Sequence, residues 1–280
     1  MSSESEGIAP APVVGWHAAE RRRIEFVLTD IDDTLTWHGR LPAVAFSAME
    51  RLAAQGLKVI PITGRPAGWC DHIARMWPVE GVVGENGALW FRYDPHARRL
   101  VRRFLVDEPT RRENRERLTA LAARILREVP GCALASDQLY READLAIDYC
   151  EDVPALPAAA VARIVALFEE AGCTAKVSSI HVNGWFGGYD KLSMTRCLLR
   201  EAFATDLEAD PGRFVFVGDS PNDQPMFAFF AHSVGVANLR RFLPGLATPP
   251  RWLTENEGGH GFAELADLLL STRPAIPRYS

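Results

Sequence analysis

The sequence predicts an α/β fold in which a Rossmann-like parallel-sheet core is interrupted by an inserted α+β domain. Short apolar segments rich in β-branched residues alternate with helix-type segments over residues 24–87, and this alternation resumes after residue 187. Strand–helix–strand order is typical of a parallel sheet with right-handed crossovers. The intervening segment instead combines a hairpin pattern with separate helices and strands.

These patterns divide the 280-residue chain into three parts. Residues 1–20 are polar and rich in proline and alanine, so we expect a flexible N-terminal tail there. The core is expected from residues 21–87 and 188–280, and the inserted α+β domain from residues 88–187.

Before the insertion, we expect three strands and two helical segments, the second of which leads from Pro66 to the strand at residue 81. The first helix is predicted over residues 41–55, with Pro42 in its first turn and Gly56 just past its end. Pro61 argues against the second strand, because proline donates no hydrogen bond to a ladder. The predicted strands cover residues 24–28, 57–62 and 81–83.

The insertion is predicted to start with a hairpin and to continue with two helices and two strands. Thr110 and Glu113 match a capping box at the start of the first helix. Pro157 and Gly172 bracket the second helix. The predicted strands are residues 88–93, 100–106, 145–149 and 174–182, and the helices are residues 110–129 and 157–171.

After the insertion, residues 213–217 form an apolar run of the type found in buried parallel strands. A helix over residues 191–204 is predicted before this strand. A small strand near residue 234 and a closing helix over residues 262–270 are predicted after it.

Composition excludes several functional classes. Apolar residues make up 48% of the chain and charged residues 24%, which is ordinary for a soluble protein. The net charge of −5 argues against a nucleic-acid partner, and no apolar stretch is long enough to predict a membrane span. The N-terminus does not resemble a signal peptide. Five scattered cysteines without a CxxC pair predict reduced thiols in a cytoplasmic protein.

Polar residues follow three of the predicted strands at their carboxyl ends, where parallel sheets bind ligands. Two carboxylates follow the first strand, a threonine follows the second, and two carboxylates follow the strand at 213–217. Carboxylates at two strand ends can hold one Mg²⁺, and nearby hydroxyl and ammonium groups can hold phosphate oxygens. The residues concerned are Asp30, Asp32, Thr63, Asp219 and Asp223, with Lys191 heading the helix before the last pair.

These segments resemble the four motifs of the haloacid dehalogenase superfamily, in the right order. Residues 30–35 resemble the DxDxT motif, Thr63-Gly64-Arg65 the second motif, Lys191 the third, and Gly218–Asp223 the GDxxND motif. The segment 85–88 is similar to the one that opens the cap domain in the type IIB branch, which includes sugar phosphatases and phosphomannomutases. The resemblance therefore implies that the insertion at 88–187 is a cap.

The resemblance also implies a role for each matching residue. Asp30 would be the nucleophile and a Mg²⁺ ligand. Asp32 would serve as general acid and then general base, and would offer its backbone carbonyl to the metal. Asp219 would bind Mg²⁺ with support from Asp223. The residues implied to hold the substrate's phosphoryl group are Thr63, Gly64, Lys191 and Asn222.

The cap is expected to choose the substrate, a small phosphorylated metabolite. His181 and Asn183 would share one face of a strand, and Trp185 and Phe186 could stack on a sugar or pack inside the cap. An arginine-rich segment could attract anions, although most of its members are expected to form a solvated face. Its members are Arg98, Arg99, Arg102, Arg103, Arg111, Arg112, Arg115, Arg117, Arg124 and Arg127.

The sequence thus predicts a Mg²⁺-dependent sugar phosphatase that works through an aspartyl-phosphate. A sugar phosphomutase would use the same residues and stays open as an alternative. A dehalogenase is disfavoured because Asp32 supplies an acid that a halide does not need. Two other classes, a phospho-acceptor signalling module and a non-catalytic binding module, are disfavoured by the 100-residue insertion and the four intact motifs respectively.

Overall fold

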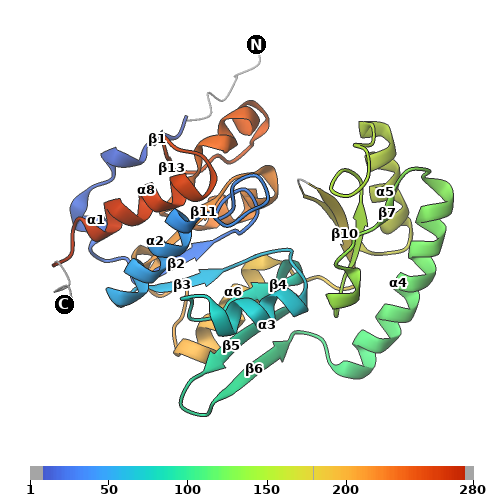
Figure 1. Cartoon of the computed structure of the whole chain (residues 1–280), viewed down its shortest axis with the longest axis horizontal. Helices are drawn as coiled ribbons and strands as arrows, with labels where there is room; N and C mark the ends of the chain where they lie inside the picture. The colour runs from blue at the N-terminus through green and yellow to red at the C-terminus, as the bar shows by residue number, and fades with distance from the viewer. Residues whose placement is uncertain (1–8, 179, 275–280) are drawn as a thin grey trace.

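The computed structural model describes residues 9–178 and 180–274. Its core is a six-stranded parallel sheet in the order β1-β13-β12-β11-β2-β3 (Figure 1). The mixed α/β architecture predicted from the sequence is confirmed. The strands are β1 (Ala11–Pro12), β13 (Trp252–Leu253), β12 (Ser233–Gly235), β11 (Phe214–Gly218), β2 (Phe26–Thr29) and β3 (Lys58–Pro61).

Helices cover both faces of this sheet, because side chains alternate along each strand. In β2, Val27 joins one apolar cluster with helices α2, α3 and α8, whereas Phe26 and Leu28 join a second cluster with α6 and α7. Each fully buried aliphatic or aromatic side chain stabilises the fold by about 1.5–3 kcal/mol. The helices are α2 (Ala43–Ala54), α3 (Ala67–Met76), α6 (Lys191–Phe203), α7 (Gln224–Phe229) and α8 (Gly258–Leu270).

The core sheet is extended beyond β3 by β4 (Val82–Gly84), β5 (Leu89–Asp94) and β6 (Arg99–Phe104). An isolated parallel bridge joins Ile62 to Val83, and the three strands then pair antiparallel. Pro61 fits within β3 because its nitrogen points toward β4, where the ladder begins only at this bridge. The hydrogen bonds from this part of the chain toward β2 are donated by the N–H groups of Lys58 and Ile62. The proline therefore removes none of them.

The hairpin β5–β6 packs with the core, although the sequence predicted it as the start of the insertion. Leu89 and Phe91 join one core cluster and Trp90 joins the other. The apolar cluster of the cap begins only with α4 (Glu108–Glu128). Asp107 caps this helix by accepting a hydrogen bond from the Thr110 N–H, so the predicted capping box is wrong and the helix starts two residues earlier.

The cap is a four-stranded antiparallel sheet, β7-β8-β10-β9, with α4 and α5 (Ala158–Glu170) on one face (Figure 1). The single strand predicted over residues 174–182 is a hairpin, in which the N–H of Ser178 donates to the carbonyl of His181. The remaining strands are β7 (Ala133–Leu134), β8 (Leu145–Asp148), β9 (Thr174–Val177) and β10 (His181–Trp185).

The N-terminal segment is not a frayed tail over residues 9–20, as the sequence analysis expected. β1 pairs in parallel with β13, α1 (Ala18–Arg21) follows, and Val13 and Trp16 are buried in the core. The Trp16 ring stacks on Trp252. Two apolar side chains in a polar segment are enough to cover the sheet edge. Residues 1–8 of the predicted tail lie outside the described residues.

Within the described ranges, no helix is long and apolar enough to cross a membrane.

Candidate active site

Parallel pairing of β2 and β11 brings two acidic loops together. Val217 lies opposite Thr29 in the register, and the N–H of Asp30 donates to the Val217 carbonyl at 2.9 Å. Asp30 and Asp219 therefore leave the carboxyl edge of the sheet side by side. This is the edge where the sequence analysis expected a ligand.

Asp30, Asp219 and Asp223 form a buried group of carboxylates. One oxygen from each lies within 4.8 Å of the others. The backbone of Gly218 allows this approach, because a Cβ there would lie 2.4 Å from Asp223 Oδ2. That oxygen accepts the N–H of Asp219 at 3.2 Å. The structure thus brings three of the four predicted metal residues together.

Burial and mutual repulsion disfavour charge on this group. Burial raises the pKa of Asp30 to about 7, and the charge of Asp223 adds to this effect while Lys191 opposes it. Burial and the charge of Asp223 also raise the pKa of Asp219 well above its usual value. Carboxylates in such a place need a compensating cation, and an all-oxygen donor set fits a hard divalent ion such as Mg²⁺.

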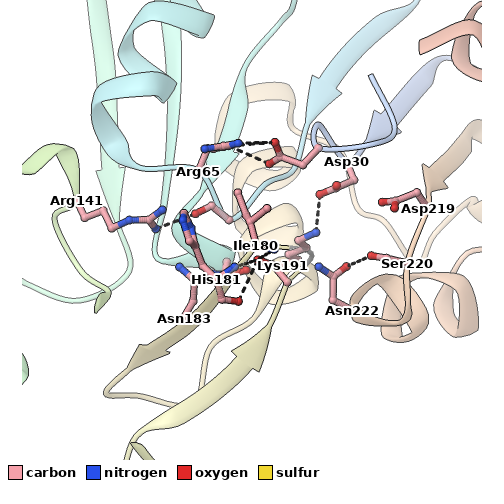
Figure 2. Close-up of a pocket in the computed structure, with 14 residues that line it drawn as sticks. Asp30, Arg65, Arg141, Ile180, His181, Asn183, Lys191, Asp219, Ser220 and Asn222 are labelled. Atoms are coloured by element: carbon pink, nitrogen blue, oxygen red, sulfur yellow. Dashed lines mark hydrogen bonds and ion pairs between the residues drawn. The ribbon is translucent and has the colours of Figure 1, made fainter. Parts of the chain in front are cut away.

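Lys191 supplies one positive charge to the same group. Its Nζ lies 2.7 Å from Asp30 Oδ1 (Figure 2). The same nitrogen lies 3.0 Å from Asp223 Oδ1. Burial alone would lower the pKa of this ammonium, but Asp223 and Asp30 outweigh burial and raise it. A capping box between Asp190 and Ser193 fixes the start of α6 and hence the position of Lys191.

The carboxylate of Asp32 lies apart from the three-carboxylate group. Arg65 Nε is 3.0 Å from Asp32 Oδ2, and Arg65 Nη2 is 2.8 Å from Asp32 Oδ1 (Figure 2). Side chains two residues apart on an extended strand would point the same way, but the chain turns after Asp30. The implied role of the Asp32 backbone carbonyl at the metal stays a prediction.

The second motif reaches the cavity through its backbone more than through its threonine. Gly64 lines the cavity, whereas Thr63 is fully buried and does not belong to its wall. Thr63 Oγ1 accepts the N–H of Arg65 at 3.0 Å, which shapes the turn before α3. The role of Thr63 in holding a phosphoryl group therefore stays a prediction.

Asn222 and Ser220 line the cavity on the β11 side, and Asn222 Oδ1 accepts a hydrogen bond from Ser220 Oγ at 3.0 Å (Figure 2). The amide nitrogen of Asn222 is thereby left to face a ligand. The contact between Asn222 and a phosphoryl group stays a prediction.

The cap forms the opposite wall through one face of β10. Val182 points into the cap core, so its neighbours His181 and Asn183 point to the cavity. His181 Nε2 lies 2.8 Å from Glu151 Oε2, and Asn183 Nδ2 donates to Asp144 Oδ2 at 3.0 Å. The predicted shared face of His181 and Asn183 thus lies against the cavity.

Trp185 and Phe186 pack inside the protein instead of facing the cavity. Trp185 is buried and stacks on Tyr189, with 5.7 Å between ring centroids. Phe186 joins the cap core, and the Arg117 guanidinium lies over its ring. Of the two readings that the sequence left open for these aromatic residues, internal packing agrees with the structure.

Glu85 fastens the cap to the core, a role that sequence reasoning missed. Its carboxylate accepts the N–H of Ala67 from the core and those of Glu142, Ala143 and Asp144 from the cap, at 2.6–3.2 Å. Burial and the charge of Asp144 raise the pKa of Glu85 to about 7. Glu85 and Asn86 both have positive φ. The one signal in the sequence is a glutamate placed directly after an apolar strand, and the structure shows that this glutamate is buried.

Arg141 is a second residue that the sequence analysis missed. It is almost completely buried and bridges the cap to the carbonyl of Gly64, which lies 3.0 Å from its Nη1. The sequence analysis singled out a different set of arginines, the arginine-rich segment, and that segment does not line the cavity. Of the residues that the structure describes in the cavity wall, none comes from that segment, and several of its members pair with surface carboxylates.

Comparison with known proteins relates the first half of this site to a protein family. Residues 27–108 match a family model described as haloacid dehalogenase-like hydrolase. No curated protein matches the chain in a sequence search. Many solved structures do match, and three of them are relevant to the cap and the site.

The C-terminal domain of a trehalose-6-phosphate phosphatase from C. albicans is 15% identical, with a TM-score of 0.67, and covers 95% of this chain and 99% of its own. A sucrose-phosphatase from Synechocystis sp., solved with sucrose and phosphate, is 16% identical, with a TM-score of 0.61 over 89% of this chain and 98% of its own. A sugar phosphatase of subclass IIB is 16% identical, with a TM-score of 0.56, and covers 82% of this chain and 92% of its own.

At these identities the solved structures show a shared fold, including the inserted cap, while the family model supplies the relationship in sequence. Both agree with the resemblance seen in the four motifs, which is thereby confirmed. The chain is thus similar in sequence to the haloacid dehalogenase-like hydrolases over residues 27–108, and it shares the fold of the sugar phosphatases described here over most of its length.

Proposed function

We propose that this hydrolase is a Mg²⁺-dependent phosphatase that cleaves a small phosphorylated metabolite, a sugar phosphate, through an aspartyl-phosphate at Asp30. The observation that carries the proposal is the contact of Lys191 with Asp30 inside a group of three carboxylates, beneath a cap. An ammonium group beside a carboxylate nucleophile can hold the oxygens of a phosphoryl group that is being transferred. The five cysteines are scattered and form no CxxC pair, as is typical of reduced thiols, and this supports a cytoplasmic location.

In the first step, a carboxylate oxygen of Asp30 attacks the phosphorus atom. The bond between phosphorus and the leaving oxygen breaks, and its electron pair stays on that oxygen. Asp32 gives the leaving oxygen a proton, so that the leaving group departs as an alcohol. Asp32 therefore has to enter this step protonated. In the structure Arg65 contacts both of its oxygens, which suits the carboxylate that Asp32 becomes after the transfer and that acts as the base of the second step.

In the second step, Asp32 removes a proton from a water molecule, whose oxygen attacks the phosphorus of the aspartyl-phosphate. The bond between phosphorus and Asp30 breaks, which restores the carboxylate and releases inorganic phosphate. Lys191 and Asn222 would donate hydrogen bonds to the phosphoryl oxygens in both steps. Removing one such donor typically costs ~10²–10³ in rate.

Asp30, Asp219 and Asp223 would hold the Mg²⁺ ion. Three buried carboxylates with one ammonium partner form a donor set of oxygen atoms with excess negative charge, which suits this cation. When bound, the ion would offset the negative charge of the carboxylates and of the phosphoryl group.

A sugar phosphate is supported by the neighbours of this fold and by the cavity wall. All three of the solved structures described above are phosphatases of sugar phosphates by name. The cap side of the cavity offers the neutral hydrogen-bonding groups of Ser178 and Asn183. Such groups match the hydroxyls of a sugar.

The test is phosphate release from p-nitrophenyl phosphate and from a panel of sugar phosphates, with Mg²⁺ and with the metal chelated. We expect activity with Mg²⁺ and its loss in Asp30→Asn, whereas Asp33→Asn, a matched change three residues along, keeps it. Asparagine tolerates the positive φ of Asp33. Undiminished activity of Asp30→Asn or of the chelated enzyme would refute the mechanism. Isomerised phosphosugar without free phosphate would favour the mutase.

A further inference from the structure

Two guanidinium groups on the cavity wall are already occupied by carboxylates. Arg65 contacts Asp32, and its Nη1 also lies 3.5 Å from Asp137 Oδ2 and 3.7 Å from Glu151 Oε1. Arg65 is only 9% exposed, so few of its donors can reach a ligand.

The second guanidinium, that of Arg141, is held as firmly. Its Nε and Nη2 donate to Asp137 Oδ1, both at 3.1 Å, and its Nη1 donates to Asp144 Oδ1 at 2.9 Å and to the Gly64 carbonyl at 3.0 Å. The two arginines therefore face four carboxylates, namely Asp32, Asp137, Asp144 and Glu151. Asp32 lines the cavity and the other three do not, so negative charge is in excess around the two arginines on this side.

The other groups on this side are neutral or already engaged. His181 lies against Glu151, and Asn183 donates to Asp144. Lys191 contacts Asp30 and Asp223 on the nucleophile side. Of the lining residues that the structure describes, the remaining polar ones near the cap carry no charge. Figure 2 shows Arg65, Arg141, His181 and Asn183 gathered on the side of the cavity away from Asp219.

We propose that this side of the cavity selects phosphate esters whose leaving group is uncharged and rich in hydroxyls, and discriminates against leaving groups that carry a second anionic group. Glu151 is the specificity-determining residue, because it lies beside both Arg65 and His181, the groups that could otherwise receive an anion. This inference rests on the proposed phosphatase function and names its substrate class more closely.

The physical reason is that charges interact strongly in a cavity that contains little water. An added carboxylate would meet two arginines that are already paired with four carboxylates, of which Asp32 lines the cavity itself. It would have to displace one of the existing ion pairs, which leaves a buried charge without a partner. A hydroxyl can accept from Asn183 or donate to a carboxylate without breaking an ion pair.

Pairs of esters that differ by one group test this directly. Sorbitol 6-phosphate and 6-phosphogluconate differ only by a hydroxymethyl group in place of a carboxylate, and so do glycerol 3-phosphate and 3-phosphoglycerate. We expect kcat/KM for the neutral member of each pair to exceed that of the anionic member by about tenfold or more. For an ester that is cleaved too slowly, its competitive inhibition constant against p-nitrophenyl phosphate replaces kcat/KM.

In Glu151→Gln, we expect the ratio within each pair to fall several-fold, because Arg65 and His181 lose a competing acceptor. Glu170→Gln is the matched control. It removes the same charge from the cap, and Glu170 also pairs with two arginines, but on the outer surface of the cap. A merely structural loss would lower both members of a pair equally and leave the ratio unchanged.

The two ways of failing are distinct. Phosphate release without preference for the neutral esters overturns this inference and leaves the proposed function intact, and so does an equal loss of preference in Glu151→Gln and Glu170→Gln. If no ester releases phosphate, including p-nitrophenyl phosphate, the proposed function fails and this inference fails with it.

Discussion

Arg65 binds Asp32 through two nitrogens, although the two residues follow different strands, and the Arg65 guanidinium lies 4.5 Å above the Trp69 ring. A forked contact of this kind fixes the plane of a carboxylate as well as its position. Asp32 is therefore oriented by the second motif, while Asp30 is oriented by Lys191.

Asp32→Asn removes both the acid of the first step and the base of the second. With p-nitrophenyl phosphate, whose leaving group needs no proton, we expect a rapid burst of about one equivalent of p-nitrophenol followed by slow turnover. With an alkyl phosphate we expect no burst and a loss of ~10²–10⁴ in kcat. Rapid-mixing kinetics measure both. A variant that loses activity equally in the first turnover of both esters would contradict the acid role.

Asp219→Asn tests the carboxylate group through stability instead of activity. Without metal, three buried carboxylates share one ammonium, so neutralising Asp219 removes repulsion and should leave the melting temperature unchanged or raise it by a few degrees. Mg²⁺ should raise the melting temperature of the wild type and have little effect on this variant. Calorimetry with and without Mg²⁺ measures the melting temperatures of both proteins. An equal Mg²⁺-induced shift in both proteins would place the ion elsewhere.

Glu85→Gln tests the fastening of the cap. The amide nitrogen of glutamine would face at least one pair of N–H donors that now share a carboxylate oxygen. Each buried donor left without an acceptor costs about 1–3 kcal/mol, so we expect the free energy of unfolding to fall by about 2–4 kcal/mol. Denaturant unfolding measures it, with Glu116→Gln on the exposed face of α4 as the control. A change below about 0.5 kcal/mol would show that Glu85 does not hold the cap.

Gly87→Ala tests the point where the chain before β5 lies against the chain before α6. Gly87 has φ +109°, and a Cβ there would lie 2.0 Å from the Asp190 carbonyl oxygen. We expect a loss of more than about 2 kcal/mol in stability, because both the backbone conformation and the contact oppose a side chain. Gly188→Ala, in the other segment, meets no atom within 4 Å and should change stability little. Similar melting temperatures for the two variants would contradict this account.

The sequence predicted that three carboxylates lie together because their meeting depends on local order. Asp30, Asp219 and Asp223 follow apolar strands, and parallel pairing brings such strand ends together whatever the details of packing. Lys191 was located by its place at a helix start. The match to four motifs added the roles that geometry alone leaves open.

The cap contacts could not be predicted, because they depend on how two separately folded segments meet. Nothing in the sequence near Arg141 indicates that it reaches the Gly64 carbonyl. The place of Glu85 after a strand is a signal, but it does not say that the carboxylate binds three cap N–H groups. The turn at Ser178 was missed because residues 174–182 alternate as one strand would. Trp16 was missed because a single large ring can anchor a segment that is otherwise polar.

The contacts described between cap and core reach the core at Gly64, Arg65 and Glu85. The hydrogen bonds of Lys191 with Asp30 and Asp223 are made within the core. Displacing the cap would break the first set and spare the second. In the proposed phosphatase, substrate and product could therefore exchange without the reacting groups being rebuilt at each turnover.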